Sequence, residues 1–128
     1  MFKNRFLYLI LFLGLLFNFN CSKSSSSSSN KVFTLTGTVY VDNVPTAGID
    51  VEFQIATGDP NIGNVTWDST VRKTDSNGKY KFERGGFREW TDYRVRAKNP
   101  FTHAYTNFKT GRAFLGTTKT EDFYFTSQ

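Results

Sequence analysis

Apolar and polar residues alternate along the first stretch of the chain after residue 31. Within residues 32–41, four apolar residues fall on one face and three threonines and a tyrosine on the other. A period of two is typical of a half-buried β-strand, because successive side chains point to opposite faces of a sheet. The residues predicted to point inward are Phe33, Leu35, Val39 and Val41.

The same alternation recurs in the segments 49–55, 65–74, 79–83, 90–98 and 118–126, and residues 101–109 are expected to add one more short strand. No window shows a helical period, and residues 56–64 are expected to form an open loop. Seven short strands in under a hundred residues predict an all-β fold, a seven-stranded antiparallel β-sandwich of the Ig-like or prealbumin-like kind. The further residues predicted to point inward are Ile49, Val51, Phe53, Ile55, Tyr80, Phe82, Tyr93, Val95, Ala97, Phe123 and Phe125, while Val65, Trp67 and Val71 share one face of their strand.

The strongest turn signal is "DSNG" at residues 75–78. Asn77 and Gly78 adopt a positive φ angle at low cost, so they reverse the direction of a strand. We therefore expect a hairpin between a strand that ends near Thr74 and one that starts near Lys79.

The N-terminus has the layout of a secretory signal. Lys3 and Arg5 precede residues 7–17, which are apolar apart from Gly14 and the hydroxyl group of Tyr8. A helix over this segment would be about 16 Å long, roughly half the ~30 Å hydrocarbon core of a bilayer. Residues 1–20 are therefore predicted to be a signal peptide.

Cys21 is the only cysteine, which excludes an internal disulfide and a cysteine-rich metal site. The run "SKSSSSSS" follows it and has no apolar surface to bury, so residues 21–30 are predicted to be a tether, and residues 31–128 the folded domain. This arrangement resembles bacterial lipoprotein precursors, in which the thiol receives a diacylglyceryl group and the cysteine becomes the new N-terminus. Asn18, Phe19 and Asn20 depart from the small residues of that pattern. The resemblance implies a palmitate-bearing lipoprotein of the bacterial cell envelope, anchored in the outer membrane.

Three stretches of the domain carry a second resemblance. The segments "GTVYVDNVPTAGIDVEF" (37–53), "TDSNGKYKF" (74–82) and "YRVRAK" (93–98) are similar to carboxypeptidase regulatory-like or transthyretin-like (prealbumin-like) domains. The resemblance implies a sandwich fold and an accessory or adhesive role. The residues that carry it are Gly37, Val39, Pro45, Gly48, Thr74, Asp75, Gly78, Tyr80, Phe82, Tyr93 and Val95.

The net charge and the few candidate catalytic or metal-binding residues limit the functions that the sequence allows. The formal net charge is +5, of which Lys3 and Arg5 supply two, so the domain is only mildly basic and no nucleic-acid partner is expected. The transthyretin-like fold includes a hydrolase that needs several histidines, whereas His103 is the only histidine here. Asp75 and Asn77 alone do not make a calcium loop. We therefore predict no catalytic residues, no cofactor and no metal.

Aromatic residues supply the remaining candidate site. If they share an exposed face, Trp67, Trp90, Tyr105 and Tyr124 could stack on sugars. Six basic residues of the domain are interpreted as a solvated sheet face; they are Arg72, Arg84, Arg88, Arg94, Arg96 and Lys98. The favoured hypothesis is a membrane-anchored lipoprotein with a non-catalytic binding or structural module, its protein or glycan partner left open. The alternatives are a carbohydrate-binding surface lipoprotein and, third, a transthyretin-like hydrolase.

Overall fold

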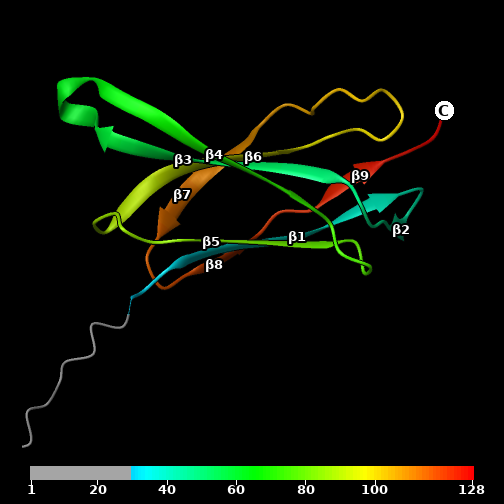
Figure 1. The fold of residues 1–128 in the computed structure, drawn as a ribbon, viewed down its shortest axis with the longest axis horizontal. Helices are drawn as coiled ribbons and strands as arrows, with labels where there is room; N and C mark the ends of the chain where they lie inside the picture. Colours follow the sequence, from blue (N-terminus) through cyan, green and yellow to red (C-terminus); the bar gives the residue numbers. More distant parts are fainter. Residues whose placement is uncertain (1–29) are drawn as a thin grey trace, which may run out of the picture.

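The computed structural model describes residues 30–128, which form nine strands in two sheets and one 3-10 turn (Figure 1). The predicted signal peptide, Cys21 and residues 22–29 of the tether lie outside the described residues. The all-β class predicted from the alternation is confirmed, and the two sheets pack face to face in a sandwich-like arrangement.

One sheet has five strands and the other four. In the five-stranded sheet, β1 pairs with each of the other strands: β2 and β5 are antiparallel to it, and β8 and β9 are parallel. The four-stranded sheet is antiparallel throughout, in the order β4-β3-β6-β7. The bounds are β1 Phe33–Val41, β2 Val44–Pro45, β3 Asp50–Asp59, the 3-10 turn Pro60–Ile62, β4 Asn64–Lys73, β5 Lys79–Arg84, β6 Trp90–Ala97, β7 Lys109–Phe114, β8 Thr118–Thr120 and β9 Phe123–Phe125.

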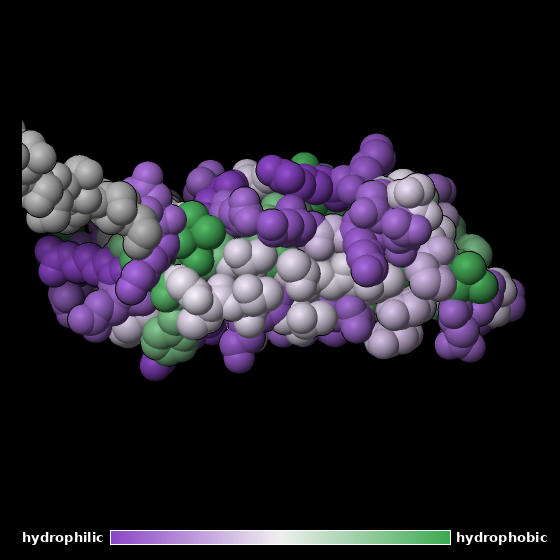
Figure 2. Space-filling view, turned by 90° about the horizontal axis from the view of Figure 1, so that it is seen from below, coloured by the Kyte–Doolittle hydropathy of each residue, from purple (hydrophilic) through white to green (hydrophobic). Residues whose placement is uncertain are grey.

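The outer face of the five-stranded sheet is polar and rich in threonine. Figure 2 looks at the molecule from the side of this sheet and shows a pale middle with hydrophilic residues around it. The outward residues of β1 lie beside those of β8, with Thr34 opposite Thr118 and Thr36 opposite Thr120. This arrangement matches the polar face predicted for residues 32–41.

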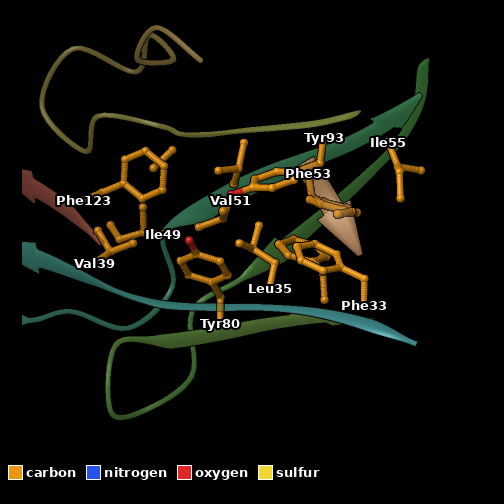
Figure 3. Close-up of a cluster of buried hydrophobic side chains, with 14 of the residues drawn as sticks. Phe33, Leu35, Val39, Ile49, Val51, Phe53, Ile55, Tyr80, Tyr93 and Phe123 are labelled. Atoms are coloured by element: carbon orange, nitrogen blue, oxygen red, sulfur yellow. The ribbon is translucent and has the colours of Figure 1, made fainter. Parts of the chain in front are cut away.

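The core lies between the two sheets (Figure 3). Ring contacts join the sheets: Phe53 of β3 stacks on Phe82 of β5 with ring centroids 5.2 Å apart, and Phe33 lies 5.2 Å from Tyr93. The inward residues predicted from the alternation are confirmed as buried, except Val41, which is partly buried against the core. The buried apolar residues are Phe33, Leu35, Val39, Ile49, Val51, Phe53, Ile55, Tyr80, Phe82, Tyr93, Val95, Ala97, Ala113, Phe123 and Phe125.

The predicted count of seven strands is not confirmed. Residues 118–126 were expected to form one strand, but they form β8 and β9, separated by Glu121 and Asp122. At this break Tyr80 donates its hydroxyl hydrogen to the backbone oxygen of Glu121, and Tyr93 donates to Glu121 Oε1 over 3.4 Å. The parallel pairing of β1 with both segments also means that the sheet is not wholly antiparallel.

The same break explains a glycine in the middle of β1. Gly37 is paired with Tyr80, and a Cβ atom at Gly37 would lie 1.9 Å from the Glu121 oxygen and 2.6 Å from the Tyr80 hydroxyl. Only a residue without a side chain leaves room for the Tyr80 ring and for the chain that passes over it.

The open loop predicted over residues 56–64 is wrong. β3 continues to Asp59 and β4 begins at Asn64, which is paired with Asp59, so the chain makes a long hairpin closed by Pro60–Ile62. Gly58 has a φ angle of 99°, and a Cβ atom there would lie 2.0 Å from the oxygen of Asn64. Gly58 therefore allows the two strands to meet closely near the hairpin end.

The strand predicted over residues 101–109 is also wrong. Within that segment Tyr105 makes one isolated bridge with Lys98, and the strand β7 starts only at Lys109. β7 was not predicted because its sequence lacks an alternation of large apolar residues. The residues of β7 after Lys109 that point toward the core are Gly111 and Ala113, which are too small to give that signal. A Cβ atom at Gly111 would lie 2.7 Å from the Tyr93 hydroxyl, so the glycine makes room for that ring.

The "DSNG" turn is present, but it does not close a hairpin. Gly78 has the expected positive φ of 71°, and Asp75 Oδ1 accepts hydrogen bonds from the backbone N–H groups of Asn77 and Lys79. However, β4 and β5 belong to different sheets, so the turn carries the chain from one layer to the other. The register of β5 is set by its pairing with β1.

Candidate functional site

The outer face of the four-stranded sheet carries a row of alternating rings and guanidinium groups. We call Trp67, Arg94, Phe108, Arg96 and Tyr105 the arginine–aromatic stack. Arg94 lies over the ring of Trp67 at 4.2 Å and over Phe108 at 4.4 Å. Arg96 lies over Phe108 at 4.4 Å and over Tyr105 at 4.5 Å. The Phe108 ring is thus held between two cations, an arrangement that favours both contacts electrostatically.

The strand alternation places both arginines outward. Tyr93, Val95 and Ala97 are buried in the core, so the residues between them on β6 point to the other face. β3 contributes Glu52 and Gln54 to the same outer face, because they are paired with Arg96 and Arg94.

A hydrogen-bonded network fixes the guanidinium groups beneath the rings. Arg96 Nε donates to Glu52 Oε2 at 2.5 Å, and Arg94 Nε donates to Gln54 Oε1 at 2.6 Å. Gln54 Nε2 and Ser69 Oγ both donate to Glu52 Oε1, at 2.7 and 2.8 Å. Glu52 is only 8 % exposed and Gln54 9 %. Buried polar groups that are fully paired rigidify a surface, so the stack is a preorganised platform.

The network keeps Glu52 ionised. Burial alone raises the pKa of this carboxyl, but hydrogen bonds from Gln54, Ser69 and Arg96 outweigh it, and the net effect lowers the pKa. Burial, and then the carboxylates of Asp50 and Glu52, raise the pKa of Tyr105.

A second ring and cation pair lies on the same sheet. The Arg112 guanidinium lies 4.4 Å from the centre of the Trp90 ring, and Arg112 Nε is 3.9 Å from Asp92 Oδ1. Trp90 is paired with Phe114 of β7, and each is 44 % exposed.

Three of the four candidate aromatic residues therefore lie on the outer face of the four-stranded sheet, Trp67 and Trp90 from its strands and Tyr105 from the segment before β7. Trp67, Trp90 and Tyr105 each contact an arginine there. Tyr124 belongs to β9 of the other sheet, where its ring stacks on Tyr40 at 4.9 Å. Val65, Trp67 and Val71 share a face, as predicted, and that face is the solvent side of β4.

The basic residues that were expected to form one solvated face lie in different parts of the structure. Arg94 and Arg96 belong to the stack, whereas Arg72 lies over the buried Phe82 ring at 5.8 Å and Arg84 donates to Thr70 Oγ1. Lys73 is paired with Asp50 at 2.7 Å and lines, with Arg72 and Lys79, a hollow of about 660 Å³ that also includes residues of β1 and β5.

The other candidate chemistry stays apart from the stack. His103 lies in an exposed loop with a φ angle of 59°, and its backbone N–H donates to the backbone oxygen of Asn99. Within residues 30–128, no three His, Cys, Asp or Glu side chains are grouped so that they could hold a metal ion. Among the same residues, no helix reaches the length and hydropathy needed to cross a membrane.

No pattern in the sequence singles out Phe108, Glu52 or Gln54 as functional residues. Phe108 lies in a segment without a period, and Glu52 and Gln54 read as ordinary outward residues. The one sequence feature that could have pointed to the network is a pair of alternating motifs, Glu-x-Gln on β3 and Arg-x-Arg on β6. These motifs lie opposite each other only because β3 pairs with β6. Neither a family model nor a curated protein matches the chain.

Proposed function

We propose that this chain is a lipid-anchored protein of the bacterial cell envelope whose β-sandwich is a non-catalytic binding or structural module. The observation that carries the proposal is the order of its parts. A charged and then apolar N-terminus precedes Cys21, a serine run follows, and the first strand begins at Phe33. The attachment point and the folded domain are therefore separated only by a short polar segment.

The family that we propose is the carboxypeptidase regulatory-like or transthyretin-like group, with its prealbumin-like or Ig-like topology. Support comes from the roles of the motif residues. Gly37 makes room for Tyr80, Gly78 adopts a positive φ at the sheet-to-sheet turn, and Phe82 packs in the core. Thr74 is buried, where its hydroxyl accepts the N–H of Ile49 and donates to the oxygen of Thr46.

The structural role of the stack supports a module that does not catalyse. Each guanidinium already lies against two rings and donates to a buried side chain of β3. Such groups brace a surface and are poorly available to move protons or to activate a substrate.

Lipidation at Cys21 is tested by metabolic labelling. The wild type, expressed in a bacterial host, should incorporate labelled palmitate and partition into detergent, because two or more acyl chains bind a membrane firmly. Cys21→Ala should do neither, while its circular dichroism spectrum stays that of the wild type. Equal labelling of the two chains would refute the proposal.

A carbohydrate-binding surface lipoprotein is the second candidate, favoured by one observation. Trp67 and Trp90 are 37 % and 44 % exposed and project from the four-stranded sheet, on the face where Tyr105 contacts Arg96. A glycan array should then show binding that is weakened by Trp90→Ala and kept by Tyr124→Ala, whose ring lies on the other sheet. Equal binding by both variants would exclude Trp90 from the sugar site.

A further inference from the structure

Five exposed apolar residues gather at one end of the domain. They are Val32, Ile62 at 74 % exposure, Val65, Trp90 and Phe114, and we call them the tether-end rim. Solvent-exposed aliphatic and aromatic side chains that cluster mark a surface that meets a partner or a membrane.

The strand directions place the rim at the end where the described chain begins. β5 runs antiparallel to β1, so it ends beside Phe33, and the N–H of Gly116 donates to the oxygen of Val32. Trp90 starts β6 opposite Phe114 at the end of β7. The tip of the β3–β4 hairpin, which holds Ile62, projects at this same end in Figure 1.

The hydropathy of the surface agrees with this placement. Figure 2 shows hydrophobic residues at the end where the described chain begins, separated by the pale middle of the face from others at the far end. The far end holds Val44, which is 61 % exposed, and Phe101.

We infer that the tether-end rim rests on the lipid surface to which the chain is anchored. This inference rests on the proposed lipidation of Cys21. Only residues 22–30 separate Cys21 from the domain, and a chain of that length spans roughly 15–20 Å on average. The end at which the chain enters the domain is therefore held near the bilayer, and that end carries the rim.

The chemistry of the rim suits the membrane interface. Tryptophan prefers the headgroup region because its ring is apolar and its N–H is polar, and Ile62 at a hairpin tip can enter the acyl boundary. Charged side chains of both signs lie at this end, so the apolar contact is expected to dominate and to depend little on salt. They include Lys31, Arg84, Arg88 and Arg112 with Asp59, Glu83, Glu89 and Asp92.

The two tryptophans of the chain give a direct test. The full-length lipidated protein carrying Trp67→Phe retains Trp90 as its one fluorophore of this type. It is reconstituted in phosphatidylcholine vesicles with or without bromine on the acyl chains, and co-flotation reports anchoring separately. We expect brominated lipid to reduce Trp90 emission on the order of twofold, equally at low and high salt.

Matched variants assign the contact to the rim. Ile62→Asp, added to the same protein, should restore most of the emission, whereas Val44→Asp at the far end should leave the quenching unchanged. Co-flotation without quenching, or equal quenching in both aspartate variants, would overturn the inference and leave the lipid anchor standing. A blue-shifted Trp90 emission that brominated lipid does not quench would assign the rim to a second copy or another protein. Loss of co-flotation in the parent protein would overturn the proposed function, and this inference with it.

Discussion

Gly78 and Gly48 form a natural pair for testing the turn between the two sheets. Both have a left-handed backbone, with φ angles of 71° and 78°. A Cβ atom at Gly78 would lie 2.5 Å from the nitrogen of Thr46 and 2.8 Å from the carbonyl carbon of Pro45, whereas one at Gly48 would meet nothing within 4 Å. Alanine substitutions at the two sites should therefore have the same conformational cost, whereas only the one at Gly78 should also have a steric cost.

The expected free energies follow from these two terms. A left-handed non-glycine residue costs about 1–2 kcal/mol, and the loss of freedom in the unfolded chain returns about 0.4–1 kcal/mol. Gly48→Ala should therefore destabilise by about 1 kcal/mol or less. At Gly78 the chain must also displace the backbone of β2 and its flank, at about 1–3 kcal/mol, so Gly78→Ala should cost about 2–4 kcal/mol in all.

Urea melts of a chain that starts at Asn30 would measure the difference. With an m-value near 1 kcal/mol per M for a small domain, the midpoint of Gly78→Ala should lie about 1–3 M below that of Gly48→Ala. Equal midpoints would show that the turn does not press against Pro45 and Thr46, and the packing of the turn between the layers would be wrong.

Three further substitutions probe the core and the stack. Gly37→Ala should cost about 2–4 kcal/mol and lower the melting temperature by about 10 °C or more, since its Cβ meets the backbone oxygen of Glu121; an unchanged thermal melt would contradict that contact. Burial, and then the Glu121 carboxylate, raise the pKa of Tyr93 to about 12, above the unfolded value near 10, so stability should hold below pH 10 and fall as the pH rises toward 12. Tyr93→Phe should make that fall shallower in alkaline unfolding curves, and an identical pH profile would refute the assignment. Phe108→Ala, which removes the ring between two guanidiniums, should cost about 1–3 kcal/mol in a urea melt, and a loss below about 0.5 kcal/mol would show that the stack contributes little.

Much of the fold could be predicted because one face of each core strand is apolar. The alternation in β1, β3, β5 and β6 identified their buried residues, and the turn chemistry identified the positive φ of Gly78. β7 could not be found, because Gly111 and Ala113 leave its inward face nearly empty so that Tyr93 can occupy the space.

Strand pairing was the part that local sequence could not supply. A good turn sequence at residues 75–78 suggested a hairpin, but the partner of β5 is β1, with paired residues 41 to 51 positions apart, because pairing is set by long-range burial. The stack was hidden for the same reason. Its members come from β4, β6 and the segment before β7, and only the assembled sheet brings Arg94 between Trp67 and Phe108.

The mature N-terminus tests the central claim most directly. Intact-mass and peptide mass spectrometry of the protein purified from the membrane fraction should show a chain that begins at Cys21, with a diacylglyceryl group on its thiol. The mass should drop by the acyl chains after lipase or alkaline treatment. A mature chain that begins elsewhere, or an unmodified Cys21 in a membrane-bound protein, would contradict the lipid anchor.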